Sequence, residues 1–66
     1  MKVMAYKRGE KDLTQWELGE MVGVHQAVIS QIENGIVGPN PELLGKLAAI
    51  LEVDPEKLLE DIKVDV

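Results

Sequence analysis

A chain of 66 residues without cysteine has room for one domain, near the size below which a hydrophobic core is no longer stable alone. The lack of cysteine excludes a disulfide framework and a thiolate metal site, which leaves well-packed helices, dimerisation or both as sources of stability. No apolar stretch reaches the about 18–20 residues of a membrane span, and the N-terminus lacks the apolar stretch of a signal peptide. We therefore expect a soluble, cytoplasmic protein.

The net charge of −5 is opposite in sign to that of most nucleic-acid-binding domains, but it is unevenly distributed. Residues 1–11 contain four basic side chains and one acidic side chain, a balance of +3. Residues 12–66 contain three lysines and eleven acids, a balance of −8. A basic N-terminal end and an acidic body allow one face to meet phosphate while the other repels it.

The first two predicted helices differ in the clarity of their boundaries. Residues 3–11 have helical character, although Gly9 interrupts them. The second helix has a clear beginning, because Thr14 followed three residues later by Glu17 is typical of a capping box. Its end is also clear, because Gly23 favours the left-handed conformation of a C-cap. Four apolar residues form its expected buried stripe: Leu13, Leu18, Met21 and Val22.

The third predicted helix runs from His25 or Gln26 to Asn34, and its inward side chains are Ile29 and Ile32. A short connection that contains glycine separates it from the second helix. Two short amphipathic helices joined in this way are typical of a helix-turn-helix, whose second helix enters the DNA major groove.

Two further helix beginnings share an N-cap, a proline at the first helical position and an acid in the first turn. They are Asn40–Pro41–Glu42 and Asp54–Pro55–Glu56. The fourth helix would bury Leu43, Leu44, Leu47, Ala48 and Leu51. The tail from Ile62 to Val66 alternates apolar and polar residues, as a short strand does. The sequence therefore predicts one compact all-α domain of five helices over residues 1–66, with its helix-turn-helix at about residues 14–34.

An ordered set of short motifs extends from about Arg8 to Leu59. The motifs are Leu13-Thr14-Gln15, Glu17-Leu18, Gly23-Val24, Ile29-Ser30-Gln31-Ile32-Glu33-Asn34-Gly35, Pro41, Leu47-Ala48 and Leu51 with Val53. Each motif alone is weak, but the set at this spacing is specific. It resembles the lambdoid repressor and Cro-like helix-turn-helix domains, often called Xre-type. The resemblance covers nearly the whole chain and implies binding to double-stranded DNA.

The resemblance also implies roles for individual residues of the third helix and its support. Gln26, Ala27 and Gln31 match the positions whose side chains reach base edges. Glutamine suits this role, because its amide can donate to and accept from adenine in a bidentate pair, and alanine suits contact with a thymine methyl. Arg8 and Glu33 match a pair that forms a buried ion pair in several members of the family, and we expect the same pair here.

Contacts to the DNA backbone are expected at the ends of the second and third helices, from Gln15, His25, Ser30 and Asn34. The dipole of a helix N-terminus favours an anion beside Gln15. His25 stands where the family usually has Ser or Thr, so a weak cap, a phosphate contact and no role at all are all open. In isolation, the glutamines would better suit a solvated polar helix face, and the resemblance to the family favours DNA contact instead.

The apolar residues near the C-terminus exceed what a small core can take up. Leu58, Leu59 and Ile62 are therefore expected to divide between the core and a homodimer contact, to which the tail residue Val64 can add. Trp16, in the first turn of the second helix, would suit a DNA contact, a protein contact or a partly exposed position equally.

The sequence departs from the family pattern after the third helix, where Ile36-Val37-Gly38 replaces a loop that is often basic. The third helix also lacks lysine and arginine, so weak non-specific affinity and dependence on dimerisation are expected. We predict a dimeric, repressor-like transcriptional regulator that binds a palindromic operator. The alternative is a protein-interaction module on the same scaffold, such as an antitoxin or co-regulator domain, which the apolar loop favours.

Catalysis is not expected. The chain has no Ser/His/Asp or Cys/His set, and it has no glycine-rich phosphate-binding loop. A single histidine does not make a metal site, and nothing in the sequence indicates a cofactor or a small-molecule ligand.

Overall fold

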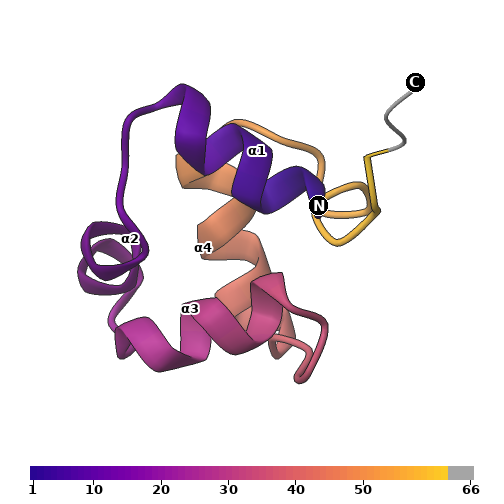
Figure 1. The fold of residues 1–66 in the computed structure, drawn as a ribbon. Coiled ribbons are helices and arrows are strands. Elements are labelled where there is room, and N and C mark those ends of the chain that lie inside the picture. Colours follow the sequence, from indigo (N-terminus) through magenta and orange to yellow (C-terminus); the bar gives the residue numbers. More distant parts are fainter. Residues whose placement is uncertain (63–66) are drawn as a thin grey trace.

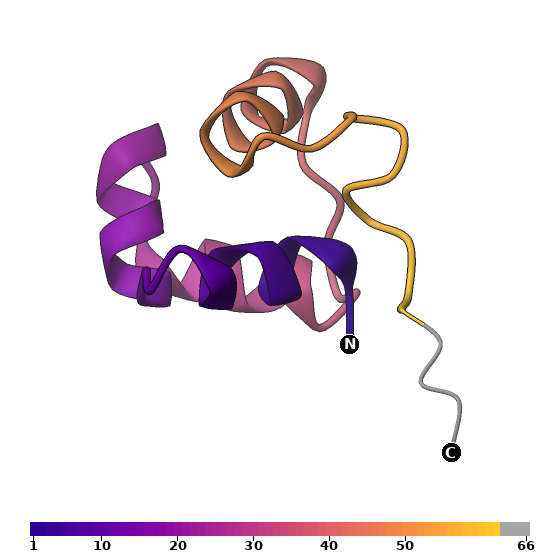
Figure 2. The ribbon, with the colours of Figure 1, turned by 90° about the horizontal axis from the view of Figure 1, so that it is seen from above.

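Four helices make up the regular structure of residues 1–62, the part of the chain that the computed structural model describes (Figure 1). They are α1 (Val3–Glu10), α2 (Gln15–Val22), α3 (Gln26–Glu33) and α4 (Pro41–Leu51). In Figure 1, α1, α2 and α3 follow one another around one side of the molecule. The view from above places α4 behind α1 and α3, with α2 running from front to back beside them (Figure 2). Within residues 1–62, no helix has the length and apolar character needed to cross a membrane.

The predicted boundaries of α2 are confirmed. Thr14 Oγ1 accepts a hydrogen bond from the Glu17 N–H at 3.0 Å, and the Glu17 carboxylate accepts one from the Thr14 N–H at 2.9 Å. This reciprocal capping box satisfies donors that a helix N-terminus otherwise leaves without partners. At the other end, Gly23 adopts a φ of 79°, which only glycine reaches without strain.

The predicted beginning of α4 is also confirmed. Asn40 Oδ1 accepts a hydrogen bond from the Leu43 N–H at 2.8 Å, and Pro41 occupies the first helical position. Proline has no N–H to leave unpaired there, and its fixed φ suits the first turn. The local sequence therefore places the beginning of α4 without help from the rest of the fold.

The hydrophobic core receives side chains from every helix and from the segment after α4. Seven of its side chains are less than 2% exposed: Met4, Leu18, Ile29, Ile32, Leu47, Leu51 and Leu58. Met21 was expected in this core, but it is 55% exposed. Each residue turns about 100° around a helix, so Gly19, rather than Met21, shares the inner face of α2 with Leu18 and Val22.

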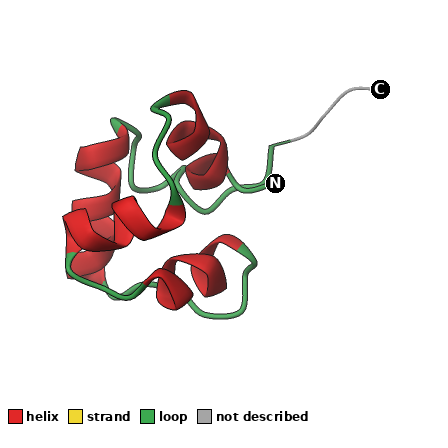
Figure 3. Cartoon of the chain, turned by 60° about the vertical axis from the view of Figure 1, so that its left-hand side comes forward, coloured by secondary structure: helices red, strands yellow, loops and turns green. Residues whose placement is uncertain are grey.

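The predicted fifth helix is absent from the described residues, and the segment after α4 consists of turns and loop (Figure 3). The predicted cap at its beginning does form, since Asp54 Oδ1 accepts a hydrogen bond from the Glu56 N–H at 2.9 Å. The carbonyl groups of Leu58 and Glu60, however, accept hydrogen bonds from the N–H groups of Met4 and Val3 at 3.0 and 2.8 Å. Contact with the N-terminus thus takes the place of helical hydrogen bonding in this segment.

The strand predicted over residues 62–66 lies outside the described residues except for Ile62. Directly before it, Lys2 and Asp61 form one antiparallel bridge. The Ile62 N–H donates to the Met1 carbonyl at 2.8 Å, which extends this contact by one residue. The N-terminus and the segment after α4 therefore lie side by side (Figures 1 and 2). The dimer candidate Val64 lies outside the described residues.

The burial of Leu58 predicts that the turn after α4 is part of the core. Replacement of Leu58 by Ala should lower the free energy of unfolding by about 2–5 kcal/mol, because it leaves a cavity beside Met4. Urea unfolding followed by circular dichroism measures this change. Leu59→Ala, at a half-buried position, is the matched control and should cost less. Equal losses for the two variants would contradict the core position of Leu58.

Candidate nucleic-acid interface

The turn between α2 and α3 brings the two helices into close contact. The Val24 N–H donates to the Gly19 carbonyl at 2.9 Å, directly after the left-handed Gly23. A Cβ atom built on Gly19 would lie 2.6 Å from the Val24 carbonyl oxygen. Even alanine would therefore force the turn away from α2, so the close approach of the two helices requires glycine at position 19.

The two sides of α3 differ in polarity. Ile29 and Ile32 are buried in the core, whereas Gln26, Ala27 and Gln31 are exposed. The buried isoleucines anchor the helix, so its outer face presents two glutamine amides and one methyl group to solvent. These are the three side chains for which the family resemblance implies base contacts.

The beginning of α3 is capped by a histidine. His25 Nδ1 accepts a hydrogen bond from the Ala27 N–H at 3.0 Å, and His25 is exposed. An imidazole nitrogen that accepts a hydrogen bond carries no proton, so in the neutral ring the hydrogen is on Nε2. The capping geometry therefore leaves an N–H donor on the outer edge of the ring.

Ser30 and Asn34 are linked to each other at the end of α3. Asn34 Nδ2 donates to the Ser30 carbonyl at 2.9 Å and lies 3.3 Å from Ser30 Oγ. Asn34 is exposed and Ser30 is half-buried. Ser30 lies on the same helix as the glutamines and Asn34 directly follows that helix, and their mutual contact restricts their conformations.

The first turn of α2 offers backbone donors. The N–H groups of Gln15 and Trp16, the first two of the helix, have no intrahelical carbonyl to bind, as at every helix N-terminus. The Thr14 hydroxyl already accepts the Glu17 N–H. The Trp16 side chain is 56% exposed beside these donors. A helix N-terminus with two available N–H groups favours an anion.

An ion pair links α1 to the end of α3. Arg8 Nε donates to Glu33 Oε2 at 2.7 Å, and Arg8 Nη2 donates to Glu33 Oε1 at 3.1 Å. Arg8 Nη1 donates to the Leu13 carbonyl at 2.8 Å, in the connection between α1 and α2. The Glu33 side chain is only 6% exposed, so it depends on these donors for compensation of its charge.

Gln15 completes this arrangement, which we call the Arg8–Glu33–Gln15 junction. Gln15 Nε2 donates to Glu33 Oε1 at 3.0 Å, and Gln15 is half-buried. The family resemblance implies only a phosphate contact for Gln15, and the sequence gives no indication of this hydrogen bond. The two residues are 18 positions apart and meet because α3 packs closely against α2, with the turn after Gly23 lying against Gly19.

The outer face of α3 carries little charge. Glu33 is the single charged residue of this helix, and it is nearly buried and paired with Arg8. Much of the acidic excess lies elsewhere, in the segment after α4: Glu52, Asp54, Glu56, Glu60 and Asp61. Glu17 remains near the beginning of α2, where the N–H of Thr14 and then its hydroxyl lower the pKa of the carboxyl group.

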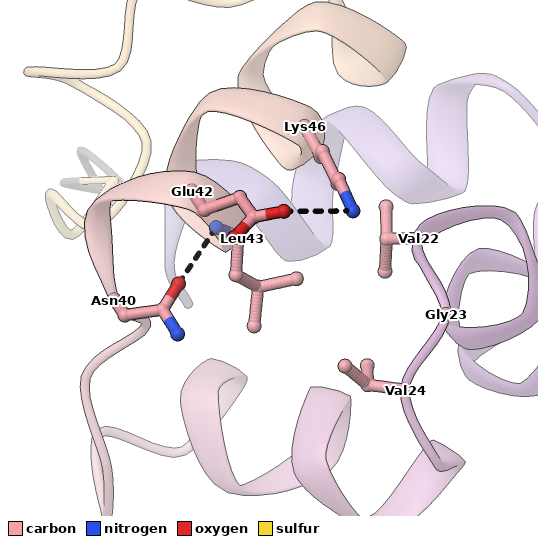
Figure 4. Close-up of a pocket in the computed structure, with 7 residues that line it drawn as sticks. All are labelled: Val22, Gly23, Val24, Asn40, Glu42, Leu43 and Lys46. Atoms are coloured by element: carbon pink, nitrogen blue, oxygen red, sulfur yellow. Dashed lines mark hydrogen bonds and ion pairs between the residues drawn. The ribbon is translucent and has the colours of Figure 1, made fainter.

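Two hollows on the surface of residues 1–62 are small. One of about 200 Å³ lies between the α2–α3 turn and the beginning of α4 (Figure 4) and is lined by Val22, Gly23, Val24, Asn40, Glu42, Leu43 and Lys46. Small-molecule pockets typically measure about 300–1,000 Å³ and are mostly apolar. A second hollow, of about 300 Å³, is lined mainly by charged residues: Lys7, Glu10, Lys11, Leu51 and Glu52. Neither has the character of a ligand pocket.

The residues predicted to form a dimer contact differ in burial. Leu58 is fully buried inside the chain, so it has no surface left for a partner, and that assignment is corrected. Leu59 and Ile62 are half-buried and keep exposed surface near the N-terminus.

These features define a helix-turn-helix domain: a capped helix, a tight glycine turn, and a second helix that is anchored on one side and polar on the other. The sequence pattern of the helix-turn-helix family matches residues 4–58, and the chain belongs to this family, in its Xre-type branch.

Among curated proteins, the chain is similar to the "ImmF control region 10 kDa protein" of Bacillus phage phi105, with 35% identity over 48 residues. The match covers 73% of this chain and 53% of the phage protein, so the chain spans about half the length of this relative. No solved structure matches the chain significantly.

The Arg8–Glu33 ion pair predicts a large effect of its removal on stability. Arg8→Ala should lower the free energy of unfolding by about 3–5 kcal/mol, because it leaves the carboxylate of Glu33 nearly buried without a counter-charge. Urea unfolding measures the change. Lys46→Ala, which removes an exposed pair with Glu42, is the control and should cost at most about 0.5 kcal/mol. A loss below about 1 kcal/mol for Arg8→Ala would contradict a structural role.

The capping box predicts a dependence of stability on acid. The Thr14 N–H lowers the pKa of Glu17 in the folded state, so this contribution is complete above the unfolded pKa, near the ordinary value of 4.5. It is lost as the pH falls through the folded pKa. Glu17→Gln should therefore reduce the loss of stability between about pH 6 and about pH 3, measured by urea unfolding. Part of the acid-dependent loss of stability should persist in this variant, because the ion pair with Lys11 also lowers the pKa of Glu52. An unchanged pH profile would exclude Glu17 as a contributor.

Proposed function

We propose that the protein is a DNA-binding transcription regulator that reads sequence in the major groove through the outer face of α3. The observation that carries this proposal is the combination of Gln26, Ala27 and Gln31 on the exposed face of a helix whose opposite face is buried. Glutamine amides pair with adenine edges, and a methyl group packs on thymine. The family and the control-region name of the phage relative support the same function.

The backbone contacts of this proposal surround the reading face. The amide and N–H group of Gln15 and the Nε2–H of His25 supply donors at the beginnings of α2 and α3. Ser30 and Asn34 supply further polar groups along α3. Contacts of this kind set the register of the helix in the groove, and the base-facing side chains then specify sequence.

Tight binding on this account depends on two copies of the chain. The face of α3 contributes no lysine or arginine, so few phosphates are neutralised and the salt dependence of binding by one copy is shallow. Two copies related by a two-fold axis would read half-sites about 34 Å apart. Leu59 and Ile62 are the described residues proposed for the contact between the copies.

A protein-interaction module is the second candidate function. The observation that favours it is the loop after α3, where Ile36 is 69% exposed and Val37 is 42% exposed. Two neighbouring exposed aliphatic side chains suit contact with a protein better than contact with phosphate.

Selection of binding sites from a randomised duplex pool tests the DNA-reading function. The expected result is a palindromic consensus whose half-sites are about one helical turn apart. In that consensus, Gln31→Ala should relax the preference at one base pair per half-site by about 1–3 kcal/mol. Asp54→Ala, in the turn after α4, is the control and should leave the consensus unchanged. Recovery of sequences without a consensus would contradict sequence-specific reading and favour the interaction module.

A further inference from the structure

The carboxylate of Glu33 controls the orientation of a side chain on a different helix. Glu33 Oε1 accepts hydrogen bonds from both Arg8 Nη2 and Gln15 Nε2, at 3.1 and 3.0 Å. A carboxylate can only accept, so the nitrogen end of the Gln15 amide must face it. The amide nitrogen has two hydrogens, and the second remains available to another acceptor.

Gln15 is the first residue of α2, where the N–H groups of Gln15 and Trp16 have no intrahelical partners. Before an anion binds, a freely rotating amide would point its carbonyl oxygen toward this position as well as its nitrogen, and binding would have to select the nitrogen. An amide held by Glu33 keeps its nitrogen in one place and has lost that rotational entropy before binding.

We propose that Glu33 is a positioning residue for DNA binding: its carboxylate fixes the Gln15 amide as a phosphate donor at the beginning of α2. This inference rests on the proposed function. Because Gln15 begins α2 and Glu33 ends α3, the contact also fixes the phosphate-binding end of one helix relative to the base-reading face of the other.

The charge of Glu33 allows its positioning effect on Gln15 to be distinguished from its electrostatic repulsion of DNA. A carboxylate near DNA repels phosphate, so removal of its charge alone should tighten binding. Removal of its positioning effect should weaken binding. The two roles of Glu33 therefore predict opposite signs for the same substitution.

The experiment measures fluorescence anisotropy with a mixed-sequence duplex of about 20 base pairs at low salt. Gln15→Ala should weaken binding about tenfold, the effect of one lost hydrogen bond to a charged group. Glu33→Gln should weaken it about threefold to fivefold, because an amide has one acceptor oxygen in place of two and cannot accept all three hydrogen bonds from Arg8 and Gln15. The double variant should bind no more weakly than Gln15→Ala, because Glu33 acts through Gln15. Glu20→Gln, an exposed site with the same change of charge, is the control and should not weaken binding.

Each other outcome has a defined meaning. Tighter binding by Glu33→Gln, or a double variant that shows the full product of the two single effects, would overturn the positioning role and leave the proposed function intact. Absence of binding by the unmodified protein would instead contradict the proposed function.

If Glu33→Gln fails to fold, a measurement on the unmodified protein tests whether Glu33 holds the Gln15 amide. In the absence of DNA, NMR should show hydrogen exchange of the Gln15 side-chain amide slowed at least about tenfold relative to the exposed Gln26 amide. Equal exchange rates for the two amides would overturn the proposal.

Discussion

The fold of this domain depends on how it compensates one nearly buried carboxylate. Glu33 is the last residue of α3, and it receives donors from α1 and from the first residue of α2. Its partner Arg8 also binds the Leu13 carbonyl, so the connection between α1 and α2 is held by the same group. A charge in this position is costly without its partners, and therefore the three helices stay in one relative arrangement.

That arrangement accounts for the properties of the outer face of α3, for which we propose DNA contact. The close approach at Gly19 sets α3 against α2, and the Arg8–Glu33–Gln15 junction holds the other end of α3. Charge compensation by Arg8 leaves the outer face of α3 polar without exposing its acid. Leu58 closes the core on the far side, where the chain returns to the N-terminus. The face can then present uncharged hydrogen-bonding groups from a rigid helix, as sequence reading requires.

Local signals in the sequence predicted the helix boundaries that are set by contacts between neighbouring residues. Thr14 with Glu17, Gly23 and Asn40 with Pro41 each set a helix boundary through contacts within a few positions. The segment after Asp54 has an equally good beginning, but the N-terminus takes the carbonyls that a fifth helix would use. This competition joins residues far apart in sequence, and no local pattern reveals it. The hydrogen bond from Gln15 to Glu33 escaped prediction for the same reason, whereas the motif resemblance directly pointed to Arg8 and Glu33 as a pair.

An NMR titration of backbone amides with a mixed-sequence duplex at low salt tests the central claim most directly, because sequence-independent binding uses the same face as specific binding. The account predicts shifts that cluster at the beginning of α2 and along the outer face of α3 and that reverse when salt is added. The residues are Gln15, Gln26, Ala27, Gln31 and Asn34. Shifts confined to the basic N-terminus, or the absence of shifts, would contradict the assignment of this face to DNA.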